Sequence, residues 1–184
     1  ISRKCAIAKG IPPAAFARYV CSNHLVKIRR GVYAMDGAID DLFQLQRRYP
    51  RIVYSGLTAL YLLDLTDRIP DSIEFTVSKG CRVRKESIGP NAIYHIENDV
   101  ELFGMGNVSA ETVFGNSVTC FSKEKRVVEI IRKRDDYDSE LFLKAARMFL
   151  KGKDKDMDFL FRYARMRKME EKVYQILEVV DYKD

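Results

Sequence analysis

Four acidic residues between positions 64 and 74 are the first candidates for chemistry, because carboxylates can hold a catalytic metal ion. They are Asp64, Asp67, Asp71 and Glu74. A metal-dependent nuclease site would need an acid and a lysine two residues apart on one strand, so that both face the metal. Two positions after Glu74 lies Thr76, and Lys79, at an odd spacing, would face the other side of a strand. The pattern argues against a nuclease, and helix caps or surface charges explain these acids better.

Other residue types give no catalytic or metal-binding pattern. A nucleotidyltransferase would need a Gly-Ser turn with paired metal-binding aspartates, but the order here is Ser55-Gly56. The four cysteines, at positions 5, 21, 81 and 120, have no short paired spacing, and only His24 and His95 could join them around zinc. The sequence therefore predicts a protein without enzymatic activity, metal or cofactor, whose thiols stay reduced in the cytoplasm.

Positive charge is concentrated at the start of the chain. From Ile1 to Ala34 there are seven Lys or Arg residues and no Asp or Glu, and up to Arg48 there are nine basic and three acidic residues. The whole chain has a net charge of +6, so the remaining 136 residues carry 23 charges of each sign. A basic segment of this kind is the electrostatic footprint of a nucleic-acid-binding module.

Small and basic side chains in this segment could contact DNA directly. A helix from Pro13 to Ser22 would have a small outer face with one charge, which suits close approach to a major groove. Two arginines at the tip of a following hairpin suit phosphate or minor-groove contact. The candidate DNA-binding residues are Pro13, Ala14, Ala17, Arg18, Lys27, Arg29, Arg30 and Tyr33. The local pattern is also consistent with a helix and hairpin that have only a solvated basic turn.

Residues Gly10 to Ala34 have the pattern of the second half of a winged helix-turn-helix. Gly10 can adopt a positive φ at the end of a short first helix, and Pro13 suits the first position of the next one. That recognition helix would run from Pro13 to Ser22, and the hairpin wing from Val26 to Ala34. The residues expected to pack inward from the helix are Ala15, Phe16, Tyr19 and Val20.

The rest of the chain mixes strand and helix patterns. Strands are expected at 51–54, 73–77, 92–97, 107–112 and 117–121, and helices at 39–49, 56–63, from 123 onward and through the last 47 residues. Strands followed by a run of helices predict an α+β domain. The expected organisation is a winged helix-turn-helix at 1–37 and an α+β domain at 38–184.

Two further basic runs lie outside the winged segment. They comprise Arg82, Arg84 and Lys85, and then Lys123, Lys125 and Arg126. Nearby acids could balance both runs on a solvated face, or the runs could form a second surface for DNA or a partner.

Several strings of residues resemble the AbiEi family, the antitoxins of abortive-infection type IV toxin–antitoxin systems. The first is Leu25-Val-Lys-Ile-Arg-Arg-Gly-Val-Tyr-Ala34, which is similar to the wing of that family. The others are Ser55-Gly-Leu-Thr-Ala-Leu-Tyr-Leu-Leu63, Leu65-Thr-Asp-Arg-Ile-Pro-Asp71, Thr76-Val-Ser-Lys-Gly80, and Phe114-Gly-Asn-Ser-Val118 leading into 123–134. Their order and spacing, rather than any one string, carry the resemblance, which covers nearly the whole chain. Because the family has another helix before the turn, that helix is expected to be missing from this sequence.

The resemblance implies an autoregulatory repressor and antitoxin. Its winged helix would bind operator DNA, and its second domain would oppose a nucleotidyltransferase-like toxin without forming a stable complex. Regulators with one winged helix per chain usually bind inverted repeats as two copies. Two alternatives stay open: a regulator whose second domain binds a small ligand or protein partner, and, with weaker support, a degenerate nuclease.

Overall fold

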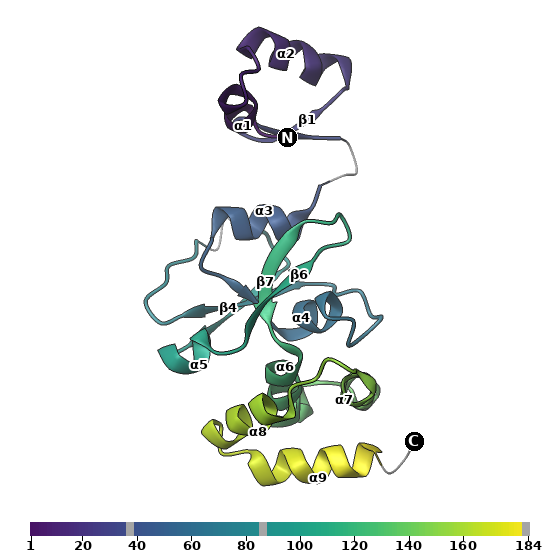
Figure 1. Ribbon diagram of the computed structural model, residues 1–184. Helices are drawn as coiled ribbons and strands as arrows, with labels where there is room; N and C mark the ends of the chain where they lie inside the picture. The colour runs from purple at the N-terminus through teal and green to yellow at the C-terminus, as the bar shows by residue number, and fades with distance from the viewer. Residues whose placement is uncertain (36–38, 85–87, 182–184) are drawn as a thin grey trace. The chain divides into compact units, whose positions relative to one another are not determined.

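The computed structural model describes residues 1–35, 39–84 and 88–181 and divides the chain into two compact units. Unit 1 comprises Ile1–Asp41 and unit 2 comprises Leu42–Asp184, four residues beyond the predicted boundary. Helices and two separate sheets make this an α+β protein (Figure 1). In the described ranges, no helix combines the length and apolar character needed to cross a membrane.

Unit 1 contains two helices followed by a hairpin. Its elements are α1 (Arg3–Ala8), α2 (Pro13–Ser22), β1 (Val26–Arg29) and β2 (Val32–Ala34). The hairpin is antiparallel, with an irregularity between Lys27 and Arg29. Ser2 forms an isolated antiparallel bridge with Val32, so the first residues lie beside the hairpin as a further extended segment.

The turn between α1 and α2 has the predicted chemistry. Gly10 adopts a φ of +82°, which lets its N–H donate to the Ile7 carbonyl at 2.9 Å while the Ile11 N–H donates to Ala6 at 3.0 Å. Pro13 occupies the first turn of α2, where its missing N–H has no cost. The predicted bounds of the second helix are confirmed.

Only a small core forms in unit 1. Phe16 is its one buried hydrophobic side chain among the described residues, and its ring meets Tyr33 edge-on at 5.6 Å between centroids. The prediction that Tyr19 packs inward is wrong, because this side chain is 52% exposed. The inward face of α2 is centred on Phe16. No described residue of unit 1 packs over the Tyr19 side chain closely enough to bury it.

Unit 2 is built on a five-stranded mixed sheet. The strands are β3 (Val53–Tyr54), β4 (Ile73–Ser78), β5 (Ala92–Glu97), β6 (Asn107–Glu111) and β7 (Ser117–Phe121). They lie in the order β5-β4-β3-β7-β6, with β4–β5 and β3–β7 parallel and the other pairs antiparallel. All five agree with the predicted strands to within two residues at each end.

Helices surround this sheet and continue beyond it. They are α3 (Asp41–Arg48), α4 (Gly56–Leu62), α5 (Val100–Gly104), α6 (Lys123–Arg132), the 3-10 turn η2 (Arg134–Asp136), α7 (Ser139–Lys151), α8 (Met157–Met166) and α9 (Glu170–Asp181). Ser122 caps α6, since its hydroxyl accepts from the Lys125 N–H at 3.4 Å. The short helix α5 was not predicted. Its five residues are too few to show a hydrophobic period, and Asp99 caps it.

Two hydrophobic clusters make up the core of unit 2. One joins the sheet to α3 and α4 around Tyr54, Phe75 and Cys120. The other lies among α6, α7, α8 and α9, which gather at one end of the unit (Figure 1). Helix α6 follows β7 directly and lies at the centre of the helical cluster. Its side chains are therefore buried on nearly every side of the helix.

Candidate functional site

The predicted DNA-contacting residues of α2 lie on its exposed side. Pro13, Ala14, Ala17 and Arg18 are all exposed and carry the small, singly charged face expected for groove contact. In the hairpin, Lys27 and Arg30 are exposed, while the side chain of Arg29 lies outside the described structure. Tyr33 is half-buried and packs on Phe16, so part of its ring belongs to the core of unit 1.

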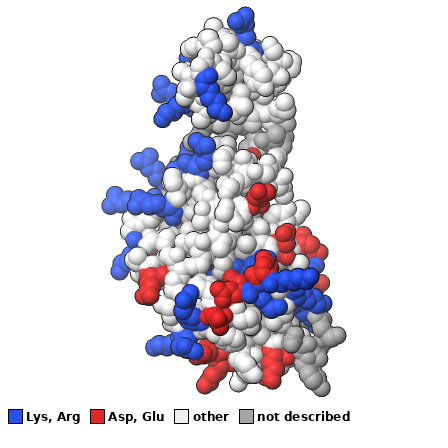
Figure 2. All heavy atoms as spheres, in the orientation of Figure 1, with Lys and Arg blue, Asp and Glu red and all other residues white. Residues whose placement is uncertain are grey.

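Unit 1 has an excess of basic over acidic residues. Its 41 residues include seven Lys or Arg and three Asp, against 25 basic and 23 acidic residues in unit 2. On the face drawn in Figure 2, Lys and Arg spheres protrude from the part of the surface formed by unit 1. No described Lys or Arg side chain of unit 1 forms an ion pair, so these charges remain available to an anionic partner.

The second basic surface expected around α6 is wrong for two of its members. Lys125 and Arg126 are only 1% and 4% exposed, because α4, α7, α8 and α9 pack around this helix. Lys123 is partly exposed and forms a 2.8 Å ion pair with Asp154. In the other run, Arg82 and Arg84 are exposed, and Lys85 lies outside the described residues.

Lys125 acts inside the fold. Its Nζ donates to the backbone carbonyls of Leu102 at 2.5 Å and Met105 at 3.0 Å, at the end of α5. The same Nζ lies 3.5 Å from the centroid of the Phe121 ring, within cation–π range. Burial lowers the pKa of Lys125 to about 7, although Glu129 acts in the opposite direction. This lysine ties α6 to α5 and offers little to an outside partner.

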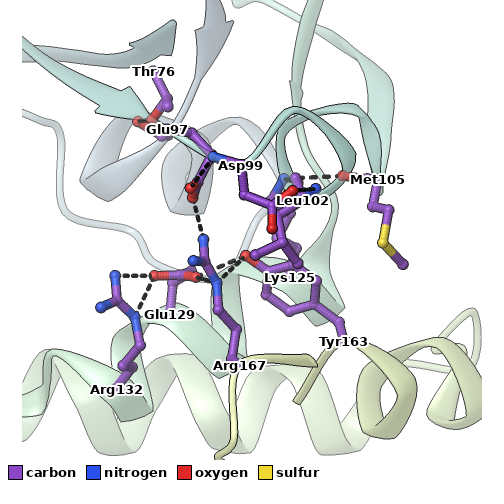
Figure 3. A network of polar contacts seen from close by, with 11 residues as sticks. Thr76, Glu97, Asp99, Leu102, Met105, Lys125, Glu129, Arg132, Tyr163 and Arg167 are labelled. Carbon is purple, nitrogen blue, oxygen red and sulfur yellow. Dashed lines mark hydrogen bonds and ion pairs between the residues drawn. The ribbon is translucent and has the colours of Figure 1, made fainter. Parts of the chain in front are cut away.

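Glu129 is the centre of a buried polar network. Its Oε1 accepts from the Tyr163 hydroxyl at 2.7 Å and faces the Arg167 Nε at 2.9 Å, and its Oε2 accepts from both Nε and NH2 of Arg132 (Figure 3). Burial would raise the pKa of Glu129, but Arg167, the Tyr163 hydrogen bond and Arg132 together hold it below its usual value. The carboxylate is therefore ionised and fully occupied.

Arg167 links this network to the sheet. Its guanidinium also pairs with Glu97, at the end of β5, and its Nε lies 3.0 Å from the Tyr163 oxygen. In Figure 3 Arg167 reaches between Glu97 and Glu129. Burial alone would lower the pKa of Arg167, but Glu129 and Glu97 raise it above its usual value, so the arginine stays charged. One guanidinium thus joins α8, α6 and β5.

Glu74 forms a second polar contact, at the start of α4. Its Oε1 accepts from the Leu57 N–H at 3.1 Å, and its Oε2 lies 3.6 Å from His95 Nε2. Gly56 has a φ of +55°, and a Cβ on it would overlap the Glu74 carboxylate, so glycine is required there on both counts. Burial would raise the pKa of Glu74, but the His95 and Leu57 contacts and nearby Arg126 lower it.

A cavity of about 590 Å³ lies between these two groups of contacts. Its walls come from β4, β5, β7, the start of α4, and the helices α6 and α8. Its volume falls within the ~300–1,000 Å³ of typical ligand pockets. Sequence reasoning did not find it, because its residues come from positions 55 to 167. The sequence of α6 contained one signal. Its charged residues lie directly beside Val127-Val128 and Ile130-Ile131, so some of them must lie on the buried side of the helix.

Comparison with known proteins shows the fold. No protein-family model matches the chain, and no curated protein matches it significantly. Among solved structures, it is similar to the RV2827C protein from Mycobacterium tuberculosis, with a TM-score of 0.54 and 14% identity. The match covers 92% of this chain and 64% of that one, so the chain spans less than two thirds of the length of that protein. At this identity the two share an α+β fold.

Proposed function

We propose that this protein is a DNA-binding transcriptional autorepressor and antitoxin of the AbiEi type. Unit 1 is then a winged helix-turn-helix that binds double-stranded operator DNA, and unit 2 counteracts a nucleotidyltransferase-like toxin. The observation that carries the DNA-binding part is the exposed basic surface on α2 and the hairpin of unit 1, whose described Lys and Arg side chains form no ion pair.

The order of elements in unit 1 supports this proposal. The extended residues at the start pair with β2, since the Tyr33 N–H donates to the Ile1 carbonyl at 2.9 Å and Ser2 bridges to Val32. This extended segment, two helices joined by a tight turn, and a hairpin occur in that order along the chain, which agrees with the order expected of a winged helix. In that arrangement α2 is the recognition helix and the tip at Arg30 is the wing.

The antitoxin role is supported by the sequence resemblance. One of its strings in unit 2, Ser55 to Leu63, forms α4 with one residue on either side, and Gly56 lies against Glu74. Because the proposed mechanism needs no stable complex with the toxin, co-purification of the two should be weak. A neighbouring reading frame that encodes a nucleotidyltransferase-like toxin would support this role, and a growth assay would measure it.

The DNA-binding proposal is tested by the salt dependence of binding to a duplex from the protein's own promoter. The slope of log K against log salt is negative, and each lost phosphate contact reduces its magnitude by about 0.9. The double variant Arg29→Ala/Arg30→Ala should therefore make the slope shallower by up to about 2. Lys153→Ala/Lys172→Ala is the matched control, since it removes the same charge from exposed sites of unit 2. Equal slopes for the wing variant and the wild type would contradict the wing assignment.

Binding by two copies to an inverted repeat forms part of the same proposal. Footprinting should show two half-sites of opposite orientation, and light scattering should show weak or no dimer without DNA. A single unrepeated half-site would exclude the first statement, and a tight dimer in free solution would exclude the second.

A further inference from the structure

The cavity in unit 2 has more cations than its own carboxylates neutralise. The charged residues in its walls are Lys125, Arg126, Arg132, Lys133, Arg167, Glu97 and Glu129. Both carboxylates are already paired, with Arg167 between them and Arg132 on Glu129. Among the described residues, the other three cations have no carboxylate partner, and since Lys125 is held by two backbone carbonyls, Arg126 and Lys133 are the two that remain for a ligand. The cavity is therefore positively charged, and it lies in the unit whose total charge is nearly balanced.

Arg126 is the cation that the fold leaves least satisfied. It is 4% exposed, and one hydrogen bond is formed by its guanidinium, from NH2 to the Tyr137 hydroxyl at 3.3 Å. Its Nε is buried and has no hydrogen-bond partner among the described residues. Glu74 senses the charge of Arg126 but forms no ion pair with it. A buried guanidinium with free donors costs free energy unless something else accepts from it.

Other donors border the same space. Lys133 is half-buried, and His95 lies at the cavity wall with its side chain 41% exposed. The Thr76 hydroxyl donates to Ser55 Oγ at 2.9 Å, which leaves the Ser55 proton for a further acceptor. Arginine, lysine and hydroxyl donors around one space match the three acceptor oxygens and multiple charge of a phosphate group better than a single carboxylate.

We propose that this cavity binds a small phosphorylated molecule of up to about nucleotide size, whose phosphate is held by Arg126 and Lys133. The tyrosines and Phe121 in the walls give the remainder of such a molecule an apolar surface. The proposal does not depend on DNA binding by unit 1, because the cavity is formed by residues of unit 2 alone.

Calorimetric titration of the full chain with inorganic pyrophosphate, at constant ionic strength, tests the proposal. The wild type should show saturable 1:1 binding. Arg126→Met should weaken it by at least about tenfold, since a charge-assisted hydrogen bond is lost. Lys133→Met should weaken it severalfold. Arg134→Met is the control, because Arg134 is adjacent and exposed but does not line the cavity, and it should bind as the wild type does.

Circular dichroism establishes which variants fold. If Arg126→Met does not fold, the comparison of Lys133→Met with Arg134→Met decides. Absence of saturable binding to wild type, or equal loss in both of those variants, would overturn the proposal. Tighter binding of tricarballylate than of pyrophosphate would assign the cavity to carboxylates and reject the phosphate. Weaker duplex DNA binding by Lys133→Met, with no pyrophosphate binding, would instead make the cavity part of a nucleic-acid surface and equally reject it.

Discussion

The two units use basic residues in opposite ways. Among the described side chains of unit 1, Lys and Arg lie on the surface of a small core and form no ion pairs. In unit 2, Lys125, Arg126 and Arg167 are drawn into the interior, where they contact carbonyls, a tyrosine hydroxyl and carboxylates. The same residue types are thus exposed in one unit and buried in contacts with the fold in the other.

Charge counting alone cannot make this distinction. The run Lys123 to Arg126 has three positive charges and the hairpin tip of unit 1 has two, yet Lys125 and Arg126 are buried. The two runs differ in the residues that follow them in the sequence. Arg29 and Arg30 precede a turn glycine, whereas Lys125 and Arg126 precede Val127-Val128 on a helix that crosses a hydrophobic cluster. A basic run beside β-branched pairs on a helix is therefore a poor predictor of a binding surface.

Removing the centre of the buried network should have the largest effect on stability. Glu129→Ala removes the acceptor of the buried Tyr163 hydroxyl and one of the two carboxylate partners of Arg167, while Arg132 is half-exposed, so the free energy of unfolding should fall by about 3 kcal/mol. Urea denaturation followed by circular dichroism measures it. Glu170→Ala is the matched control, since it breaks an exposed Glu–Arg pair, with Arg165, and should change stability little. Similar losses in both variants would contradict the contrast between interior and surface charge.

The pH dependence of stability should carry the signature of Lys125. Its folded pKa of about 7 lies below the ordinary 10.5, so between these values the unfolded chain holds more protons. This difference makes stability rise with pH in that window, by up to about 1.4 kcal/mol per pH unit. Lys125→Met should flatten the rise, and Lys123→Met, on the same helix but partly exposed, should keep it. The measurement is a series of urea transitions from pH 6 to pH 10 (about one unit apart), and a rise that survives in Lys125→Met would contradict the assignment.

On the unit 1 side of the comparison, Arg18 should affect recognition and leave stability unchanged. It is exposed on α2, with no ion pair among the described residues. If it reaches a base, Arg18→Ala should cost on the order of 1–3 kcal/mol on the operator and much less on unrelated duplex DNA. Competition binding with both duplexes measures the ratio. An equal loss on both would make Arg18 a phosphate contact, as expected of the wing arginines.

Local patterns predicted most of the backbone. The turn at Gly10, the start of α2 at Pro13 and the five strands of unit 2 follow from residue chemistry within a few positions, so the sequence contains them. Helix α5 escaped because five residues show no period. The face of α2 was only partly predicted, since the exposure of Tyr19 depends on what the rest of unit 1 provides.

The polar network could not be predicted in the same way. Its members, among them Glu97, Glu129 and Arg167, come from a strand and two helices that the sequence places far apart. The order of strands in the sheet decides which charged residues contact each other. Strands β4 and β5 are parallel neighbours, and a parallel pair has no hairpin turn by which the sequence could predict it. The sequence shows that charged residues of α6 lie beside its apolar pairs, but only the folded structure identifies the residues that they contact.

The smallest expected effect is that of removing unit 1 on the stability of unit 2. Both hydrophobic clusters lie within Leu42–Asp184, from Leu45 to Val180, and so does every partner of Glu129. A chain of residues 42–184 should therefore fold. Its unfolding free energy should lie within about 0.5 kcal/mol of the value for unit 2 in the full chain, because the clusters and the network that stabilise unit 2 lie within it. Under the proposed function it should protect cells that express the cognate toxin, yet bind no operator. Denaturation, a growth assay and a DNA-binding assay on the same fragment measure these three properties separately. A folded fragment that gives no protection would confine antitoxicity to the whole protein or reject the AbiEi assignment, and an unfolded one would show that the two units depend on each other for stability.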